Sequence, residues 1–313
     1  MIAHLHHCIE QLDLAAQQFA KNQAAYARFS LILTDNVAEL MFHRFAEQQM
    51  KWDEMWRHIG KAKFAHRLGI LTKPEERFIL ICHDYRNALY HQGLVHESVI
   101  ADITWHYHDV VCSLMPRING GGYWWSSRDF VSDVVKAYCG AKGLTVNPEK
   151  QIAEAAKQLA TAKPKRERSL PVALSGAALE RVEELDTDIQ FLVSDSPDKK
   201  SRSDVVFHVQ AWPFLFSSEA KGSIKLARGE KINNIDDALK MLRKYWKPPI
   251  SSDPVSRWRS RSRLLAGEDC PLKAMDKYQN LMDQMNIFCG QVRDSAMALD
   301  QHIQQQIDLA RGK

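Results

Sequence analysis

The sequence predicts a mainly α protein, in which an N-terminal helical bundle precedes a mixed α/β region that ends in a long helix. Three observations support this prediction. Apolar residues recur at helical spacing from residue 3 to about residue 161. Short runs rich in β-branched residues follow in the second half of the chain. A helical pattern rich in Met, Gln and Leu then occupies residues 272–310.

The clearest helix of the N-terminal half covers residues 73–93. It opens with Pro74 and two glutamates, where proline suits a first helical turn and acidic side chains suit the positive end of the helix dipole. Gly93 is placed to end the helix as a left-handed cap. The same periodicity predicts further helices at 3–28, 31–49, 53–68, 97–115, 127–139 and 147–161.

The C-terminal half has a more mixed pattern. Residues 189–193, 205–209 and 223–226 have the composition of strands. A polar loop is expected at 195–203, and a capped helix at 233–246. The basic, proline-containing stretch 163–171 is typical of a linker. We therefore expect two domains, a helical bundle over 1–162 and a basic region over 163–313 that serves substrate recognition or regulation.

The bulk properties exclude several classes of protein. The 313 residues carry a formal charge of +4, all of it after residue 150. No apolar run is long enough for a transmembrane helix, and the start lacks the pattern of a secretory signal. The six cysteines are scattered without a Cys-x-x-Cys pair, which favours reduced thiols. We expect a cytoplasmic protein that does not bind membranes.

Residues 86–91 read Arg-Asn-Ala-Leu-Tyr-His and are the most informative segment. Arg86 supplies a permanent charge for a phosphate, and His91 supplies a proton carrier that titrates near neutrality. About one Arg-x4-His pair is expected by chance in a chain of this composition, so the spacing alone is weak. The adjacent Asn87, the helical context and the glycine after the histidine distinguish this match.

Helical geometry separates the two charged groups of this segment. Arg86 and His91 lie roughly 140° apart around a helix, whereas Asn87 and His91 share one face. Asp84 lies on that face as well. A symmetric dimer would bring two such helices together, so that one cleft receives two arginines and two histidines.

This combination resembles the HEPN family of compact helical domains, many of which are RNases. Their motif is Arg-x(4-6)-His, frequently Arg-Asn-x-x-x-His, late in a helix of a four- or five-helix bundle. The resemblance covers about residues 1–140. Residues 31–44 resemble an early HEPN helix, which makes Asp35, Asn36 and Glu39 candidate supporting groups. Some HEPN toxins carry a modified tyrosine two residues after the histidine, but Gly93 stands there in this chain.

The resemblance implies a toxin or antiviral effector that cleaves RNA, tRNA included, at an active site formed across a homodimer. An antitoxin or another defence-system protein is the implied partner. In such a site the 2′-hydroxyl of the substrate attacks the adjacent phosphorus without a metal. Arg86 would stabilise the phosphate oxygens, His91 would transfer a proton, and Asn87 would orient His91 or donate to the phosphate.

A second cluster lies in residues 240–263, which contain eight basic residues and one acidic residue. Cations bind phosphates and tryptophan stacks on unpaired bases, so this cluster indicates an RNA-binding strip. The alternative is a basic segment that contacts acidic groups of its own chain. The candidate RNA-binding residues are Arg243, Arg257, Trp258, Arg259, Arg261 and Arg263.

Two further classes of function stay open. A non-catalytic RNA- or protein-binding subunit of a larger complex would also use the basic strip and the long helix. A metal-dependent nuclease centred on Glu219 is a weaker alternative. His4, His6, His7 and Cys8 do not have the spacing of a known metal site, so we predict neither a metal nor a cofactor.

Overall fold

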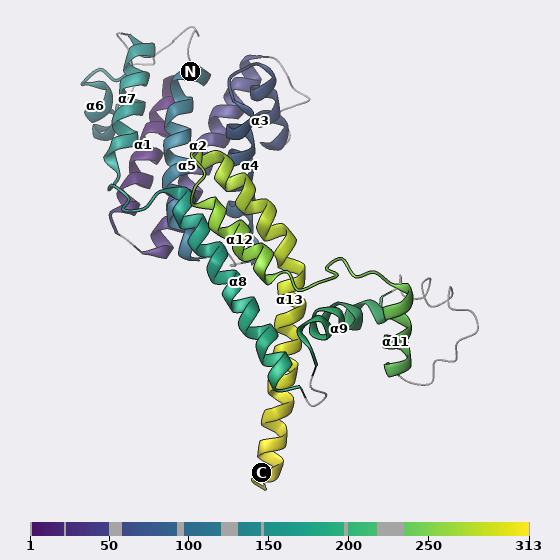
Figure 1. Ribbon diagram of the computed structural model, residues 1–313. Coiled ribbons are helices and arrows are strands. Elements are labelled where there is room, and N and C mark those ends of the chain that lie inside the picture. The colour runs from purple at the N-terminus through teal and green to yellow at the C-terminus, as the bar shows by residue number, and fades with distance from the viewer. Residues whose placement is uncertain are drawn as a thin grey trace. The chain divides into compact units, whose positions relative to one another are not determined.

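The computed structural model in Figure 1 describes residues 2–21, 23–49, 58–92, 97–119, 131–144, 147–196, 200–217 and 235–312. These residues form twelve helices and no strand. The expectation of a mainly α protein is therefore confirmed. Among the described helices, none is long and apolar enough to cross a membrane.

The strands predicted for the C-terminal half are wrong where the structure describes them. Residues 189–193 lie in α8 (Leu170–Ser194) and residues 205–209 lie in α9 (Arg202–Leu215). The third stretch, 223–226, lies outside the described residues, as does Glu219. Ile189 of α8 and three valines of α9, Val205, Val206 and Val209, are buried, and this burial outweighs their preference for strands.

The chain divides into two compact units, described separately below. Unit 1 comprises Met1–Ala177 and Ala266–Lys277, and unit 2 comprises Ala178–Leu265 and Tyr278–Lys313. Packing thus places residues 163–177 and 266–277 with the N-terminal unit. The expected domains, 1–162 and 163–313, stay a prediction about which segments fold independently.

Unit 1 is a helical bundle built around α2. Its first seven helices are α1 (Ile2–Phe19), α2 (Ala24–Gln48), α3 (His58–Arg67), α4 (Lys73–Gln92), α5 (Glu97–Asn119), α6 (Asp133–Cys139) and α7 (Pro148–Ala162). The second helix packs against α1 and α5, and α4 packs against α2, α3 and α5. Large buried side chains from three of these helices, including Phe42, Phe78 and Tyr107, fill the centre.

The break between the first two helices corrects the sequence prediction. We expected one helix over 3–28, but α1 ends at Phe19 and α2 begins at Ala24. Lys21 N donates to the carbonyl of Gln18, and Tyr26 N donates to that of Gln23. Neither glycine nor proline marks this turn in the sequence, so residue types alone did not reveal it.

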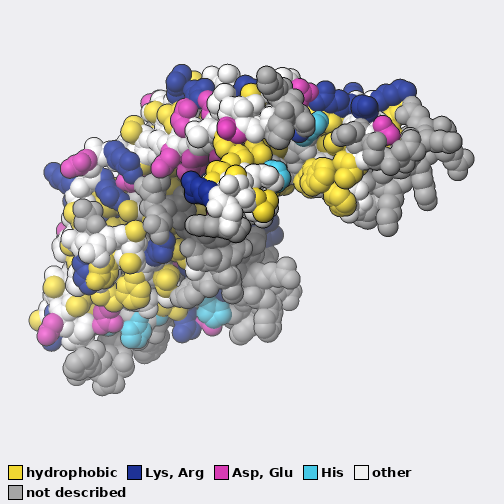
Figure 2. Space-filling model, turned by 90° about the horizontal axis from the view of Figure 1, so that it is seen from below, with side chains coloured by type: hydrophobic (Ala, Val, Ile, Leu, Met, Phe, Trp, Pro, Cys, Tyr) yellow, Lys and Arg dark blue, Asp and Glu magenta, His cyan; other side chains and the backbone are white. Residues whose placement is uncertain are grey.

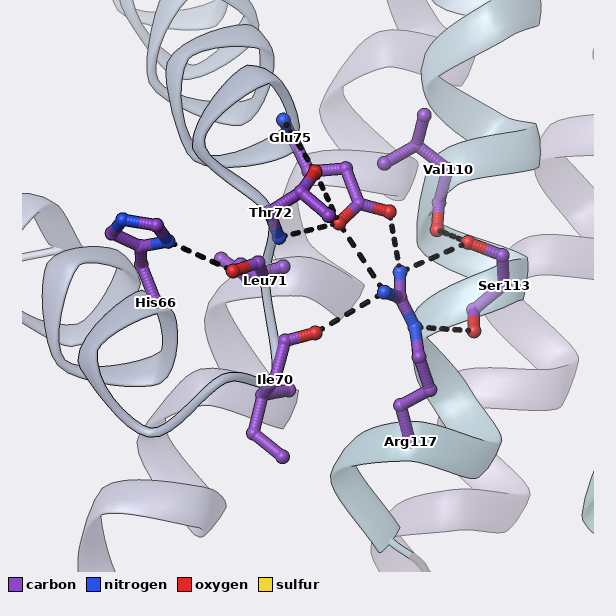
Figure 3. Close-up of polar contacts among 8 residues, drawn as sticks. All are labelled: His66, Ile70, Leu71, Thr72, Glu75, Val110, Ser113 and Arg117. Carbon is purple, nitrogen blue, oxygen red and sulfur yellow. Dashed lines mark hydrogen bonds and ion pairs between the residues drawn. The ribbon is translucent and has the colours of Figure 1, made fainter.

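The start of α4 is fixed by a polar cluster that Figure 3 shows in detail. The backbone nitrogen of Thr72 donates to Glu75 Oε2 at 2.8 Å, and the backbone nitrogen of Glu75 approaches Thr72 Oγ1 at 3.4 Å, which is a capping box. From α5, Arg117 donates to Glu75 Oε1 at 2.7 Å and to the carbonyl of Ile70 at 3.1 Å. The register of α4 against α5 is thereby set at its first turn.

Unit 2 contains α9, α11 (Ile235–Tyr245), α12 (Val255–Leu265), the later part of α8 and most of α13 (Pro271–Ala310). The long helix expected at 272–310 is confirmed. Its buried residues recur every three or four positions at Tyr278, Met282, Met285, Cys289 and Val292. An ion pair between Arg293 and Glu184, 3.1 Å apart, links α13 to α8.

Candidate active site

Arg86 lies on α4 and is held by groups from its own helix and from α2. Its Nη1 donates to Asn87 Oδ1 at 3.0 Å, and its Nη2 donates to Asn36 Oδ1 at 3.3 Å. Nη2 also lies 3.4 Å from Glu39 Oε2, and Nε lies 3.5 Å from Asp35 Oδ2. The side chain keeps 20% of its surface exposed. The structure thus brings together five of the residues selected from the sequence.

Asp35 is the centre of this cluster. Its side chain is fully buried, although it lies in the middle of α2. The Tyr107 hydroxyl, from α5, donates to Oδ1 at 2.8 Å, and Nδ1 of His83, from α4, lies 2.9 Å from Oδ2. A carboxylate only accepts hydrogen bonds, so the histidine nitrogen is the donor. One carboxylate therefore joins three helices.

His83 is the functional candidate that the sequence reasoning missed. It lies three residues before Arg86 and four before Asn87, so the three side chains share one face of α4. We had instead grouped Asp84 with Asn87 and His91. The Asp84 side chain is exposed, and its grouping with Asn87 and His91 stays a prediction, because the His91 side chain lies outside the described residues.

Electrostatics favour the charged form of His83. Burial lowers the pKa of His83, but the hydrogen bond to Asp35 and the charges of Asp35 and Glu39 outweigh this effect, so its pKa lies above the usual value. Burial and the Asp35 charge raise the pKa of Tyr107 well above its ordinary range, so the phenol stays protonated. A protonated His83 and Arg86 then balance the two carboxylates.

His91 lies in the last turn of α4, which ends at Gln92. Its side chain is outside the part of the chain that the structure describes, and so is the predicted cap residue Gly93. The pairing of His91 with Arg86 stays a prediction.

Asp35, Glu39 and His83 offer ligand atoms that all lie within 4.8 Å of one another. One nitrogen and two carboxylate oxygens at this spacing suit a divalent cation. However, the guanidinium of Arg86 already lies against both carboxylates and would repel an added cation. Among the described residues, this is the one group with such spacing.

The basic strip of residues 240–263 is divided between two helices, and most of its described arginines have partners in their own unit. Arg243, on α11, binds Asp204 and lies 4.9 Å from the ring centroid of Phe207. Arg259, on α12, donates to Glu183 at 2.7 Å and to Asp186 at 2.9 Å. These contacts fit the alternative interpretation of a basic segment that pairs with its own acidic groups.

Trp258 does not have the position that base stacking requires. Its side chain is 1% exposed and packs edge-on against Phe288, with ring centroids 5.9 Å apart. The stacking role predicted for Trp258 is therefore wrong, because the ring belongs to the core of unit 2. Arg261 donates to Gln284, whereas Arg257 and Arg263 are exposed. In Figure 2, basic and acidic side chains are interspersed over much of the described surface in view.

No protein-family model, no curated protein and no solved structure matches this chain.

Proposed function

We propose that this chain is a metal-independent endoribonuclease of the HEPN type that acts as a toxin or antiphage effector. The observation that carries the proposal is the fixed position of Arg86 near the end of α4. Four groups from two helices hold its guanidinium, and it still keeps exposed surface. A positioned guanidinium near a helix end that also carries a histidine is suited to bind a phosphodiester.

The chemistry is an intramolecular transesterification. An imidazole takes the proton from the 2′-hydroxyl, the 2′-oxygen bonds to phosphorus, and the bond to the 5′-oxygen breaks. A protonated imidazole donates to the leaving 5′-oxygen, so protons balance over the step. Arg86 stabilises the negative charge on the non-bridging oxygens. The products are a 2′,3′-cyclic phosphate and a 5′-hydroxyl, with His91 as the proton carrier.

We infer a homodimer as the active form from the resemblance to HEPN domains. Within one chain, Asp35 and Glu39 offset the charges of Arg86 and His83. A single cluster therefore exerts little net attraction on a phosphate. A second copy would add another Arg86 and another His91 to the same groove. A second copy also adds its own Asp35 and Glu39, so what the dimer gains is a second pair of catalytic groups rather than a positive field.

The direct test is RNA cleavage in EDTA, with Arg86→Ala, Asn87→Ala and His91→Ala compared with wild type. Arg86→Ala should lower the rate by roughly 10²–10³-fold, the effect of removing one group that stabilises transition-state charge. The matched control is Arg77→Ala, because Arg77 lies on the same helix but binds Asp276 at 2.6 Å. Cleavage that survives both Arg86→Ala and His91→Ala would remove the assignment.

A mixing experiment tests the dimer. Arg86→Ala and His91→Ala chains, each strongly impaired alone, should recover part of the activity when combined, because a mixed dimer keeps one intact residue of each kind. The particle mass from light scattering should be twice that of one chain. A monomer that cleaves RNA at full rate would contradict the composite site.

A non-catalytic RNA- or protein-binding subunit is the second candidate. The observation that favours it is the neutralisation of Arg86 by the carboxylates of its own chain. It predicts RNA affinity that falls when the exposed Arg257 and Arg263 are replaced by glutamine, with no cleavage at any protein concentration.

A further inference from the structure

A concave pocket of about 680 Å³ lies in unit 1 and shares no lining residue with the Arg86 cluster. Its walls come from the end of α1, the start of α2, the first half of α5 and residues 164–168. Small-molecule sites in proteins typically measure about 300–1,000 Å³. The pocket is therefore large enough for a ligand of its own.

One wall is an aromatic ring held from two sides. The indole nitrogen of Trp105 donates to the carbonyl of Pro164 at 2.9 Å. Lys163 Nζ lies 3.8 Å from the centroid of the Trp105 ring and donates to its backbone carbonyl at 2.7 Å. The side chain of Lys163 is itself fully buried and pairs with Asp109 at 2.5 Å. The indole is thus a fixed surface against which a flat ligand can pack.

Apart from Phe19 and Pro164, the rest of the apolar lining is small. Phe19 and four alanines, Ala20, Ala24, Ala27 and Ala101, line the pocket beside Trp105. Alanine side chains leave space that larger residues would fill, so the depth of the pocket depends on them. This combination of an aromatic wall and small apolar neighbours suits a planar ring.

The polar rim carries excess positive charge. Asp102 is nearly buried, and its Oδ2 accepts from Arg168 at 2.7 and 3.1 Å. Its Oδ1 lies 3.4 Å from Nε of Arg166. One carboxylate is therefore shared by two guanidiniums, and Lys165 adds a third cation to the lining, against one further carboxylate from the exposed Glu167.

Arg166 is paired with Asp102, but two of its nitrogens make no hydrogen bond to the residues that the structure describes. Its Nε and Nη2 are buried and donate no hydrogen bond within the described residues. Buried donors without acceptors are unfavourable, so this guanidinium is short of negative charge. The Arg166 side chain keeps 27% of its surface exposed, and an anion that contacts this exposed part supplies the missing charge. The rim is therefore suited to bind an anionic group beside the aromatic wall.

We propose that this pocket binds a small organic phosphate of the nucleoside monophosphate class, with its phosphate on Arg166 and Lys165 and its base against Trp105. This site is separate from the proposed RNase site and does not depend on it. A ligand here touches α1, α2 and α5 together, so its binding would also stabilise the bundle.

The test is isothermal titration of the full chain with AMP, with adenosine and inorganic phosphate as partial ligands. AMP should bind with one site per chain, and each partial ligand should bind at least about tenfold more weakly, since each satisfies half of the pocket. Quenching of tryptophan fluorescence by AMP provides a second readout on the wild-type protein.

Two variants locate the site. Arg166→Gln should weaken AMP binding at least about tenfold by removing the charge, and Ala101→Phe should abolish it by filling the space. Arg86→Ala should leave AMP binding unchanged, which separates this pocket from the RNase site. Absence of AMP binding at millimolar concentration, or affinity unaffected by both pocket variants, would overturn the proposal. Equal binding of phosphate and AMP would overturn the assigned ligand class.

Discussion

Removal of the Asp35 carboxylate should be the most damaging single change to the site. The side chain is fully buried and accepts hydrogen bonds from Tyr107 and His83. Hydrogen bonds to charged groups contribute about 1.5–3 kcal/mol each. Loss of both, with a buried phenol left unpaired, should lower the free energy of unfolding by about 3–5 kcal/mol in Asp35→Ala, as for other broken buried pairs.

Urea denaturation followed by circular dichroism measures this loss. The matched control is Asp84→Ala, an exposed carboxylate on α4, which should change stability by no more than about 0.5 kcal/mol. A loss below about 1 kcal/mol in Asp35→Ala would refute the reasoning, because it would mean that the carboxylate does not hold the three helices together.

Asp35→Asn separates charge from shape. The amide still accepts from Tyr107, but the negative charge that raises the pKa of His83 is gone, so this pKa should fall. In wild type the raised pKa stabilises the fold fully below the unfolded value of about 6.5, and this contribution is lost as the pH rises through the folded value. NMR titration of the His83 imidazole is the assay, and an unchanged pKa would contradict the assigned cause.

Three further predictions concern stability. Trp258→Ala should lower the free energy of unfolding, measured by urea denaturation, by about 3–5 kcal/mol. The control Arg257→Ala, at the neighbouring exposed position, should lower it by no more than about 0.5 kcal/mol, and equally small effects of both changes would place Trp258 outside the core. Arg117→Ala should lower the free energy of unfolding by about 1 kcal/mol. Hydrogen bonds from Arg117 and Thr72 outweigh burial and lower the pKa of Glu75, so the stability that Glu75 contributes is lost as the pH falls below about 4.5, and the variant should lose less stability in acid than wild type does. An unchanged loss of stability below this pH would argue against the assigned role. Burial lowers the pKa of His108 to about 3, so stability should fall by up to about 1.4 kcal/mol per pH unit between about pH 6.5 and pH 3, and His108→Gln should flatten this slope.

The elements that were predicted correctly are those whose signals lie in neighbouring residues of the sequence. Pro74 with two glutamates marked the start of α4, and Asn147 marked the start of α7, where its side chain accepts from Lys150 N. The long apolar repeat of α13 predicts this helix without any knowledge of its tertiary contacts. Capping and periodicity are properties of neighbouring residues, so a single sequence contains them.

The wrong predictions concern residues whose secondary structure or burial depends on contacts with residues far away in the sequence. Ile189 is buried along one face of α8, and only the packing of that helix shows that its β-branched neighbourhood is not a strand. The burial of Asp35 depends on Tyr107, which is 72 residues away in the sequence. His83 could have been found, because a histidine three residues before Arg86 shares its face of the helix.

The junction at Asp35 also has a dynamic consequence. Because α2, α4 and α5 meet at one carboxylate, the protonation state of a single imidazole on α4 affects the packing of all three helices. Opening of α4 and α5 should then be cooperative, and their amide protons near His83 and Tyr107 should exchange with solvent at rates that change together with pH. Mobility near the proposed active site would thus follow the acidity of the surroundings.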